Sequence, residues 1–163
     1  MKIILFLSLL IWVIPGFGKV KIQKPKSQHV TAFAIIVDEM TLEKTGGAVE
    51  AYRDALEADG LSTYIVSGNW KNPDEVKAEI IKLNKRKPVL EGVVFIGDIP
   101  VALIRNAQHM TTAFKMNEDE FPFPESSVPS DRFYDDLHLT FDFICQDSVN
   151  TSHFYYKLRE DSP

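Results

Sequence analysis

Apolar residues in this chain fall into short runs that alternate with longer segments of helical spacing. Residues 32–37 are six apolar residues without a polar break, a pattern typical of a strand buried on both faces of a parallel sheet. Residues 61–66 are predicted to form a second strand. Residues 90–96 are predicted to form a third, because they contain the apolar run 93–96 and are followed by Gly97.

Two helices are predicted between these strands. The first covers residues 45–59 and ends before Gly60, a residue suited to the left-handed position after a helix. Its apolar side is predicted to hold Ala48, Ala51, Tyr52, Ala55 and Leu56, and its polar side Glu50, Arg53, Asp54 and Glu57.

The second helix is predicted to begin after Asn72, with Pro73 in its first turn and acidic residues near the positive end of its dipole. It is expected to stop before Pro88. Its apolar side is predicted to hold Val76, Ile80, Ile81 and Leu83.

The order strand, helix, strand, helix, strand implies right-handed crossovers, so the predicted fold class is α/β, with a parallel sheet flanked by helices. The pattern becomes irregular after Pro100. Residues 101–115 are predicted as a short helix or a loop, and residues 117–136 as an irregular loop rich in Pro, Ser and acids. Residues 133–134 and 139–144 are predicted as short strands or a hairpin.

The N-terminus has the layout of a secretory signal peptide. Residues 3–14 are apolar except for Ser8, and Gly16 and Gly18 occupy the minus-three and minus-one places of a cut before Lys19. The apolar run is shorter than the roughly 20 residues of a membrane-spanning helix, so no stable membrane span is expected. The protein is therefore predicted to be exported, as a secreted, periplasmic or cell-surface protein.

The chain is predicted to contain one globular domain behind this leader. Its 163 residues are 45% hydrophobic and 25% charged, which fits a single core of ordinary size. The predicted organisation is a signal peptide at 1–18, a basic lead-in at 19–31 and an α/β domain at 32–163 that is incomplete at its C-terminus.

Charge and cysteine content exclude several classes of function. The chain has 23 acidic and 18 basic side chains, and this balance argues against nucleic acid as a partner. Cys145 is the only cysteine, which excludes an internal disulfide and a zinc site built from several cysteines.

Two aspartates follow the first and third predicted strands. Asp38 and Asp98 are expected at the carboxyl ends of parallel strands, where ligands of open α/β sheets bind. The pair has the chemistry to hold a divalent ion or to act in acid–base catalysis. The alternative is that both residues end strands and cap the following turns. A receiver-like phosphoacceptor domain is disfavoured, because the chain is predicted to be exported and lacks a fifth strand with a lysine.

A second acidic group lies in the irregular loop. Asp131, Asp135 and Asp136 concentrate oxygen ligands that suit calcium, and Ser130 with Asp131 forms a turn or cap signal. A regular calcium loop is absent from the sequence, so a solvated acidic loop is the alternative. No cofactor is expected to be required, and calcium is the one ion that the loop suggests.

Cys145 is interpreted as a packed structural cysteine and not as a nucleophile. It follows a strand-like run but precedes Gln146 and Asp147, which offer no glycine for a tight oxyanion turn. Nearby acidic side chains also repel the negative charge of a reactive thiolate.

Two short segments together resemble a known family. They are Gly92-Val-Val-Phe-Ile-Gly-Asp-Ile-Pro100 and Val128-Pro-Ser-Asp-Arg-Phe-Tyr-Asp-Asp136. In this order, behind a leader, they resemble the N-terminal part of gingipain-like cysteine peptidases, in which a Gly-Asp-x-Pro type turn precedes a Ser-Asp-x-Tyr-Tyr type segment. The resemblance covers roughly residues 32–145.

The resemblance implies an exported peptidase with a caspase-like α/β fold and a catalytic Cys–His pair further along the chain. In that family the histidine is followed by glycine, and this sequence contains no His-Gly pair. The chain is therefore expected to end before the dyad, and no catalytic residue is assigned. The binding candidates are Asp38, Asp98, Ser130, Asp131 and Tyr134.

Three hypotheses remain open at this point. The first is the N-terminal subdomain of a gingipain-like peptidase, inactive by itself, whose intact form takes a peptide or protein substrate. The second is a secreted, non-catalytic α/β binding module, with calcium as a candidate ligand. The third is metal-assisted hydrolysis by Asp38, Asp98 and the acidic loop. The oligomeric state is left open.

Overall fold

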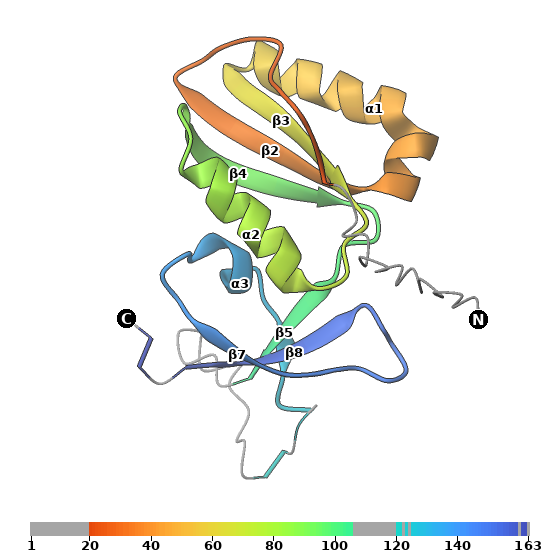
Figure 1. The fold of residues 1–163 in the computed structure, drawn as a ribbon, viewed down its shortest axis with the longest axis vertical. Coiled ribbons are helices and arrows are strands. Elements are labelled where there is room, and N and C mark those ends of the chain that lie inside the picture. The colour runs from red at the N-terminus through yellow and green to blue at the C-terminus, as the bar shows by residue number, and fades with distance from the viewer. Residues whose placement is uncertain (1–19, 106–119, 122, 124, 160, 163) are drawn as a thin grey trace, which may run out of the picture.

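The computed structural model describes residues 20–105, 120, 121, 123, 125–159, 161 and 162, and it shows an α/β fold. The predicted leader at 1–18 lies outside the described residues. Two mixed β-sheets and three helices make up the described part (Figure 1). In chain order the elements are β1 (Lys21–Gln23), β2 (Thr31–Asp38), α1 (Glu39–Ala58), β3 (Leu61–Gly68), α2 (Pro73–Asn84), β4 (Val89–Ile96), β5 (Val101–Arg105), β6 (Val128–Pro129), α3 (Arg132–Asp135), β7 (Phe141–Gln146) and β8 (His153–Leu158).

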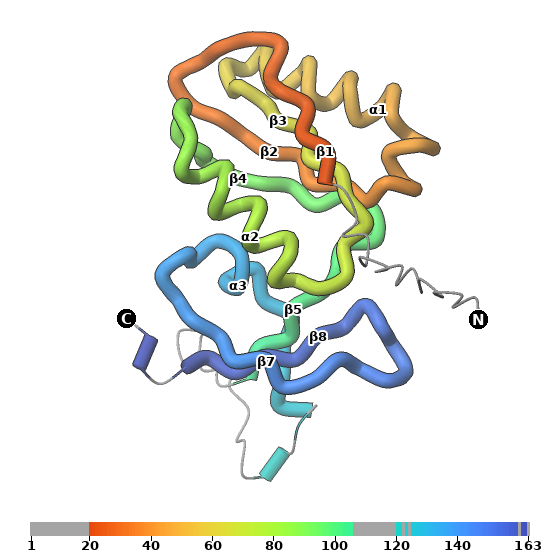
Figure 2. Tube along the Cα trace, in the orientation of Figure 1, coloured from red at the N-terminus to blue at the C-terminus, as the bar shows by residue number. Residues whose placement is uncertain are grey.

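The first sheet has the strand order β1-β3-β2-β4. Strand β2 pairs in parallel with β3 on one side and with β4 on the other. Strand β1 pairs antiparallel with β3, so the sheet is mixed and not wholly parallel as the sequence predicted. The basic lead-in supplies this extra strand: its backbone extends the sheet at the β3 edge, as the chain trace shows (Figure 2).

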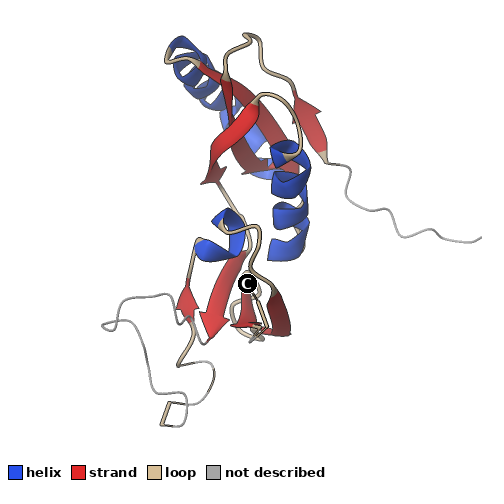
Figure 3. Cartoon of the chain, turned by 90° about the vertical axis from the view of Figure 1, so that its left-hand side faces the viewer, coloured by secondary structure: helices blue, strands red, loops and turns tan. Residues whose placement is uncertain are grey.

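The unbroken apolar run in β2 follows from its central place in this sheet. Ala34 and Ile36 point into a core on the α2 side, whereas Ile35 and Val37 point into a core on the α1 side. All four side chains are fully buried. The two helices lie on opposite faces of the sheet, and this arrangement leaves β2 no face for a polar residue (Figure 3).

Helix α1 is longer than predicted, and it buries a different face. It begins at Glu39, because the Asp38 side chain accepts a hydrogen bond from the backbone N–H of Thr41 and caps the helix. Its buried residues are Val49, Arg53 and Glu57. Tyr52, predicted to lie on the apolar side, is 40% exposed, and Ala48, Ala51 and Ala55 are also exposed, so only Leu56 of that predicted side is partly buried.

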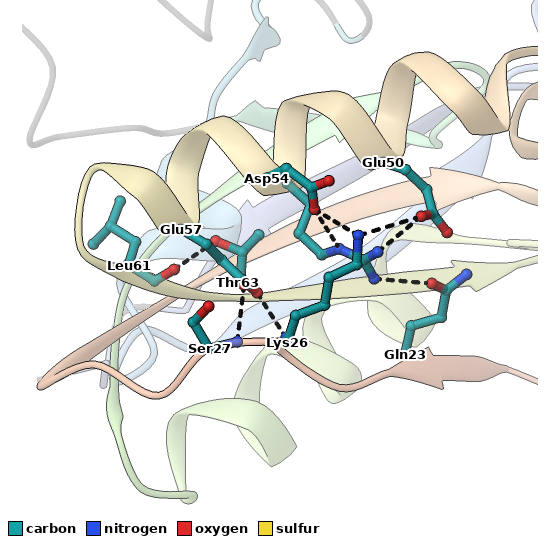
Figure 4. A network of polar contacts seen from close by, with 9 residues as sticks. Gln23, Lys26, Ser27, Glu50, Asp54, Glu57, Leu61 and Thr63 are labelled. Atoms are coloured by element: carbon teal, nitrogen blue, oxygen red, sulfur yellow. Dashed lines mark hydrogen bonds and ion pairs between the residues drawn. The ribbon is translucent and has the colours of Figure 1, made fainter.

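The polar residues on this face are buried because the lead-in segment lies against them (Figure 4). The two carboxylate oxygens of Glu57 accept hydrogen bonds from the backbone N–H groups of Lys26 and Ser27, both at 2.9 Å. The Arg53 guanidinium pairs with Glu50 at 2.9 Å and donates to the side-chain oxygen of Gln23 at 3.1 Å. Buried charge is tolerated here because each group meets an opposite charge or a backbone donor.

The start of helix α2 is as predicted from the sequence. The Asn72 side chain accepts a hydrogen bond from the Glu75 N–H at 2.9 Å, and Pro73 occupies the first turn. Val76, Ile80 and Leu83 are buried, as predicted, and Ile81 is intermediate.

The region after Pro100 forms a second sheet, with the order β6-β5-β8-β7. Residues 101–105 were predicted as helix or loop and are a strand, whereas residues 106–115 of that prediction lie outside the described residues. Residues 133–134 were predicted as a strand and lie in α3, because the chain turns there to bury both aromatic rings. β7 and β8 form the antiparallel pair of a hairpin.

Helix α2 joins the two sheets into one core, because it lies between them (Figure 1). The Tyr156 hydroxyl of β8 donates a 2.6 Å hydrogen bond to Asp74 of α2. The Lys77 ammonium lies 4.8 Å from the Phe133 ring centroid and donates to the Leu139 carbonyl oxygen at 3.2 Å. A single buried cluster therefore contains side chains from the first sheet, α2 and the second sheet.

We predict that Tyr156→Phe lowers the free energy of unfolding by about 1 to 2 kcal/mol, because it removes a hydrogen bond to a carboxylate and keeps the buried ring. The matched control is Tyr52→Phe on the exposed side of α1, which should change stability by less than about 0.5 kcal/mol. Urea unfolding followed by circular dichroism measures both. Equal effects of the two variants would contradict the contribution of the Tyr156–Asp74 contact.

Candidate functional site

The carboxyl ends of β2 and β4 form a crevice next to the point where the strand order reverses. The chain passes from β2 to β3 on one side and then to β4 on the other, and such switch points are where open α/β sheets bind ligands. Asp38 and Asp98 both line a cavity of about 270 Å³ at this end. The structure thus brings the two predicted aspartates to one crevice.

The Asp38 carboxylate is fully engaged by the backbone. Its Oδ1 accepts from the Thr41 N–H at 2.9 Å, and its Oδ2 accepts from the Asp98 N–H at 2.8 Å. Burial acts to raise the pKa of Asp38, but the hydrogen bonds from Thr41 and Asp98 outweigh it and hold the pKa below its usual value. The residue is therefore a charged cap that joins the start of α1 to the turn after β4.

Gly97 makes this arrangement possible. Its φ is +86°, and a Cβ at this position would overlap the Asp38 carboxylate and come within 2.8 Å of the Thr41 Cβ. Glycine is therefore required twice, for the left-handed backbone and for the close approach of Asp38.

Trp70 also lines this crevice, and the sequence did not single it out. Its indole Nε1 donates to the Val37 carbonyl oxygen at 3.2 Å, and its ring lies against Gly68. Trp70 and Asp98 also line a second cavity of about 190 Å³ that reaches Ser152 at the β7–β8 hairpin. The available signal was an aromatic residue shortly after the end of β3, at the switch point.

The acidic loop does not gather its three aspartates. The Asp136 carboxylate pairs with Arg132 at 3.3 Å and accepts from the His138 N–H. Asp131 precedes α3 without a side-chain cap bond, and Asp135 is exposed on that helix. Within the described part of the chain, no group of three His, Cys, Asp or Glu side chains is placed to hold a metal ion.

Ser130 and Tyr134 have structural partners. The Ser130 N–H donates to the Ala102 carbonyl oxygen at 3.2 Å, and its hydroxyl accepts from the Arg132 N–H at 3.3 Å. The Tyr134 hydroxyl donates to the Pro100 carbonyl oxygen at 2.8 Å, and burial raises its pKa far above the usual value. Tyr134 therefore fastens the loop to the turn after β4, and Ser130 fastens it to β5.

Cys145 lies in β7 beside a bulge and opposite Tyr155. It is a free thiol of intermediate exposure. Among the described residues, no histidine is hydrogen-bonded to it: His153 contacts Asn150, and the backbone of His29 binds Ser62. His109 lies outside the described residues.

A larger cavity, of about 410 Å³, lies along β4 between the C-terminal half of α2 and the segment that follows α3. It was not expected from the sequence, because its walls come from three separated segments. Of the candidate residues, Tyr134, Asp135 and Asp136 line it.

No family model, curated protein or solved structure matches this chain. Over the residues that the structure describes, no helix is both long enough and apolar enough to cross a membrane.

We predict that Gly97→Ala destabilises the fold more than Gly60→Ala. Gly60 has a similar φ of +94°, but a Cβ there meets nothing within 4 Å, so Gly60→Ala carries only the left-handed strain of about 1 to 2 kcal/mol. Gly97→Ala adds the clash with Asp38, and the expected loss is about 3 kcal/mol or more. Thermal and urea unfolding compare the two variants, and equal losses would refute the close approach of Asp38.

We also predict that Asp38→Asn lowers the free energy of unfolding by about 1 to 2 kcal/mol at pH 7. Because the pKa of Asp38 is lowered by folding, its charge stabilises the folded state above about pH 4, and this stabilisation is lost as the pH falls through the folded-state pKa. The difference between the two proteins should therefore shrink with acidification. Asp59→Asn, at the exposed C-terminal end of α1, is the control, and a difference that stays constant down to pH 2 would contradict the prediction.

Proposed function

We propose that this chain is the N-terminal α/β part of an exported, gingipain-like cysteine peptidase, and that the intact protein hydrolyses peptide bonds through an acyl-enzyme. In this proposal the described residues form a scaffold that positions the catalytic region, and the Cys–His dyad lies in sequence beyond this chain.

The observation that carries the proposal is the contact between the two segments of the resemblance. The Tyr134 hydroxyl of the second segment binds the Pro100 carbonyl oxygen of the first at 2.8 Å. The Tyr134 ring also meets the Phe95 ring edge-on, with centroids 4.8 Å apart. Two short matches far apart in sequence thus form one structural feature, which supports the resemblance more strongly than either match alone.

The central part of the first sheet also agrees with the proposal. Strands β2, β3 and β4 run parallel in the order β3-β2-β4, and α1 and α2 cover opposite faces. A caspase-like α/β domain requires such a parallel core. The fold alone does not identify an activity, so the assignment rests on the paired segments.

The second candidate function is a secreted binding module without catalysis. The cavity of about 410 Å³ along β4 favours it, because the cavity is lined by both apolar and charged residues. Calcium binding is the weaker form of this candidate, since Asp136 is already paired with Arg132.

The test is to follow the reading frame beyond Pro163 and to express the intact product. We expect a His-Gly pair, then an apolar strand and a cysteine, and hydrolysis of a fluorogenic peptide that is lost when the downstream cysteine is replaced by alanine. Cys145→Ser is the matched control and should leave the rate unchanged, because Cys145 is proposed to be structural. A stop codon directly after Pro163, or loss of hydrolysis in Cys145→Ser, would overturn the proposal.

A further inference from the structure

The cavity along β4 borders the edge strand of the first sheet. Strand β4 is the last strand in its sheet and pairs only with β2 among the described residues. Four consecutive residues, Leu90, Glu91, Gly92 and Val93, line the cavity. Leu90 and Val93 both pack against the apolar cluster that contains α2, because the extra residue between them interrupts the alternation of the strand, so the cavity lies beside this edge strand on the α2 side of the sheet. The edge of a strand presents backbone N–H and C=O groups free to pair with another chain.

The walls beside this edge are largely apolar. Ile80 of α2 and Leu137 after α3 line the cavity together with Tyr134. The Tyr134 hydroxyl is held by Pro100 and its ring packs against Phe95, so Tyr134 forms a fixed part of the cavity wall. The cavity therefore offers backbone hydrogen bonds on one side and contacts for an apolar side chain around it.

Some of the charged residues that line the cavity form an ion pair, and others do not. Arg132 and Asp136 form an ion pair at 3.3 Å and neutralise each other. Glu91 and Asp135 are exposed, and within the described residues no ion pair involves either of them. Lys77 is near Asp135 but is held over the Phe133 ring and bound to a backbone carbonyl.

Basic residues follow Asn84 in the loop that enters β4, but they do not line the cavity. Three acidic side chains, Glu91, Asp135 and Asp136, and one arginine, Arg132, line the cavity, so its lining carries a net negative charge. A ligand with a basic side chain complements this charge.

A bulge limits how far a pairing strand can extend. Leu90 pairs with Ala32 and Gly92 with Phe33, which leaves Glu91 as an extra residue in β4. Bulges twist an edge and interrupt continuous pairing, so this edge suits a short segment and resists open-ended sheet growth.

We propose that this cavity binds a short extended segment of a partner polypeptide, which adds as a strand to the edge of β4 with an apolar side chain against Leu137 and Tyr134 and a basic side chain beside Glu91 and Asp135. Main-chain hydrogen bonds give such binding its affinity, and alternate side chains give its specificity. The proposal does not depend on peptide hydrolysis, so its failure would leave the peptidase assignment untouched.

The test uses the full chain and a six-residue peptide of alternating valine and threonine with one central lysine, and binding is followed by isotope-edited NMR. We expect amide shifts at residues 90–93 and 132–138. Replacing the lysine with glutamate should weaken binding about fivefold or more, because it removes a solvent-exposed ion pair and adds repulsion between like charges. In one series the backbone nitrogens of the odd-numbered peptide residues are methylated, and in the other those of the even-numbered residues. One series should lose binding and the other should keep it, because a strand pairs with β4 along only one of its edges.

Glu91→Gln with Asp135→Asn should remove the preference for lysine over glutamate and leave the fold intact, because both side chains are exposed. The matched control is Glu43→Gln with Asp59→Asn, two exposed acids of the α1 region that do not line the cavity, and it should keep the preference. Equal loss of affinity in both N-methyl series, or shifts confined to other residues, would overturn the proposal. Concentration-dependent dimerisation with shifts at 90–93 and no peptide present would assign the edge to a second copy of the chain and overturn it too.

Discussion

Burial of helix α2 on two sides is the constraint on which the rest of this structure depends. Val76, Ile80 and Leu83 belong to one apolar cluster with Ala34 and Ile36 of the first sheet, and the same cluster contains aromatic residues of the second. A helix of 12 residues is marginal by itself, so its stability comes from this packing. The second sheet in turn has its aromatic residues covered because α2 lies over them. Neither layer buries its apolar surface without the other.

Polar contacts then fix how the layers meet. The Asp38 carboxylate ends β2, caps α1 and holds the backbone of Asp98, so one side chain sets where β4 turns away from the first sheet. Tyr134 holds the same connection from the other side through Pro100. Because β5 follows directly, these contacts decide where the second sheet begins. Asp38, which the sequence suggested as a ligand-binding residue, thus has a structural role. The hydrogen bonds of that role also lower its pKa.

The two functional proposals rest on different parts of this structure. The peptidase assignment rests on the meeting of residues 92–100 and 128–136, which the contact between Tyr134 and Pro100 brings into one unit. The binding inference rests on a place where the same layers do not pack closely. The segment after α3 stands away from β4 far enough to leave a cavity of about 410 Å³ and an uncovered strand edge. A bulge and an exposed Glu91 keep that edge from pairing without limit.

The sequence by itself determined the local elements whose signals lie within a few residues: the buried strand at β2, the Asn72 cap and Pro73 start of α2, and the left-handed glycine after α1. It also placed Asp38 and Asp98 at one end of the sheet, because strands joined by helical crossovers run parallel and their carboxyl ends meet at the same edge. Only the tertiary structure decided the buried face of α1, since Arg53 and Glu57 are buried by partners about thirty residues away in the chain. The same holds for α3 and the second sheet. There, Phe133 and Tyr134 are helical because burial against α2 and β5 outweighs their preference for strands. The local sequence does not contain these tertiary contacts, so it could not predict the outcome.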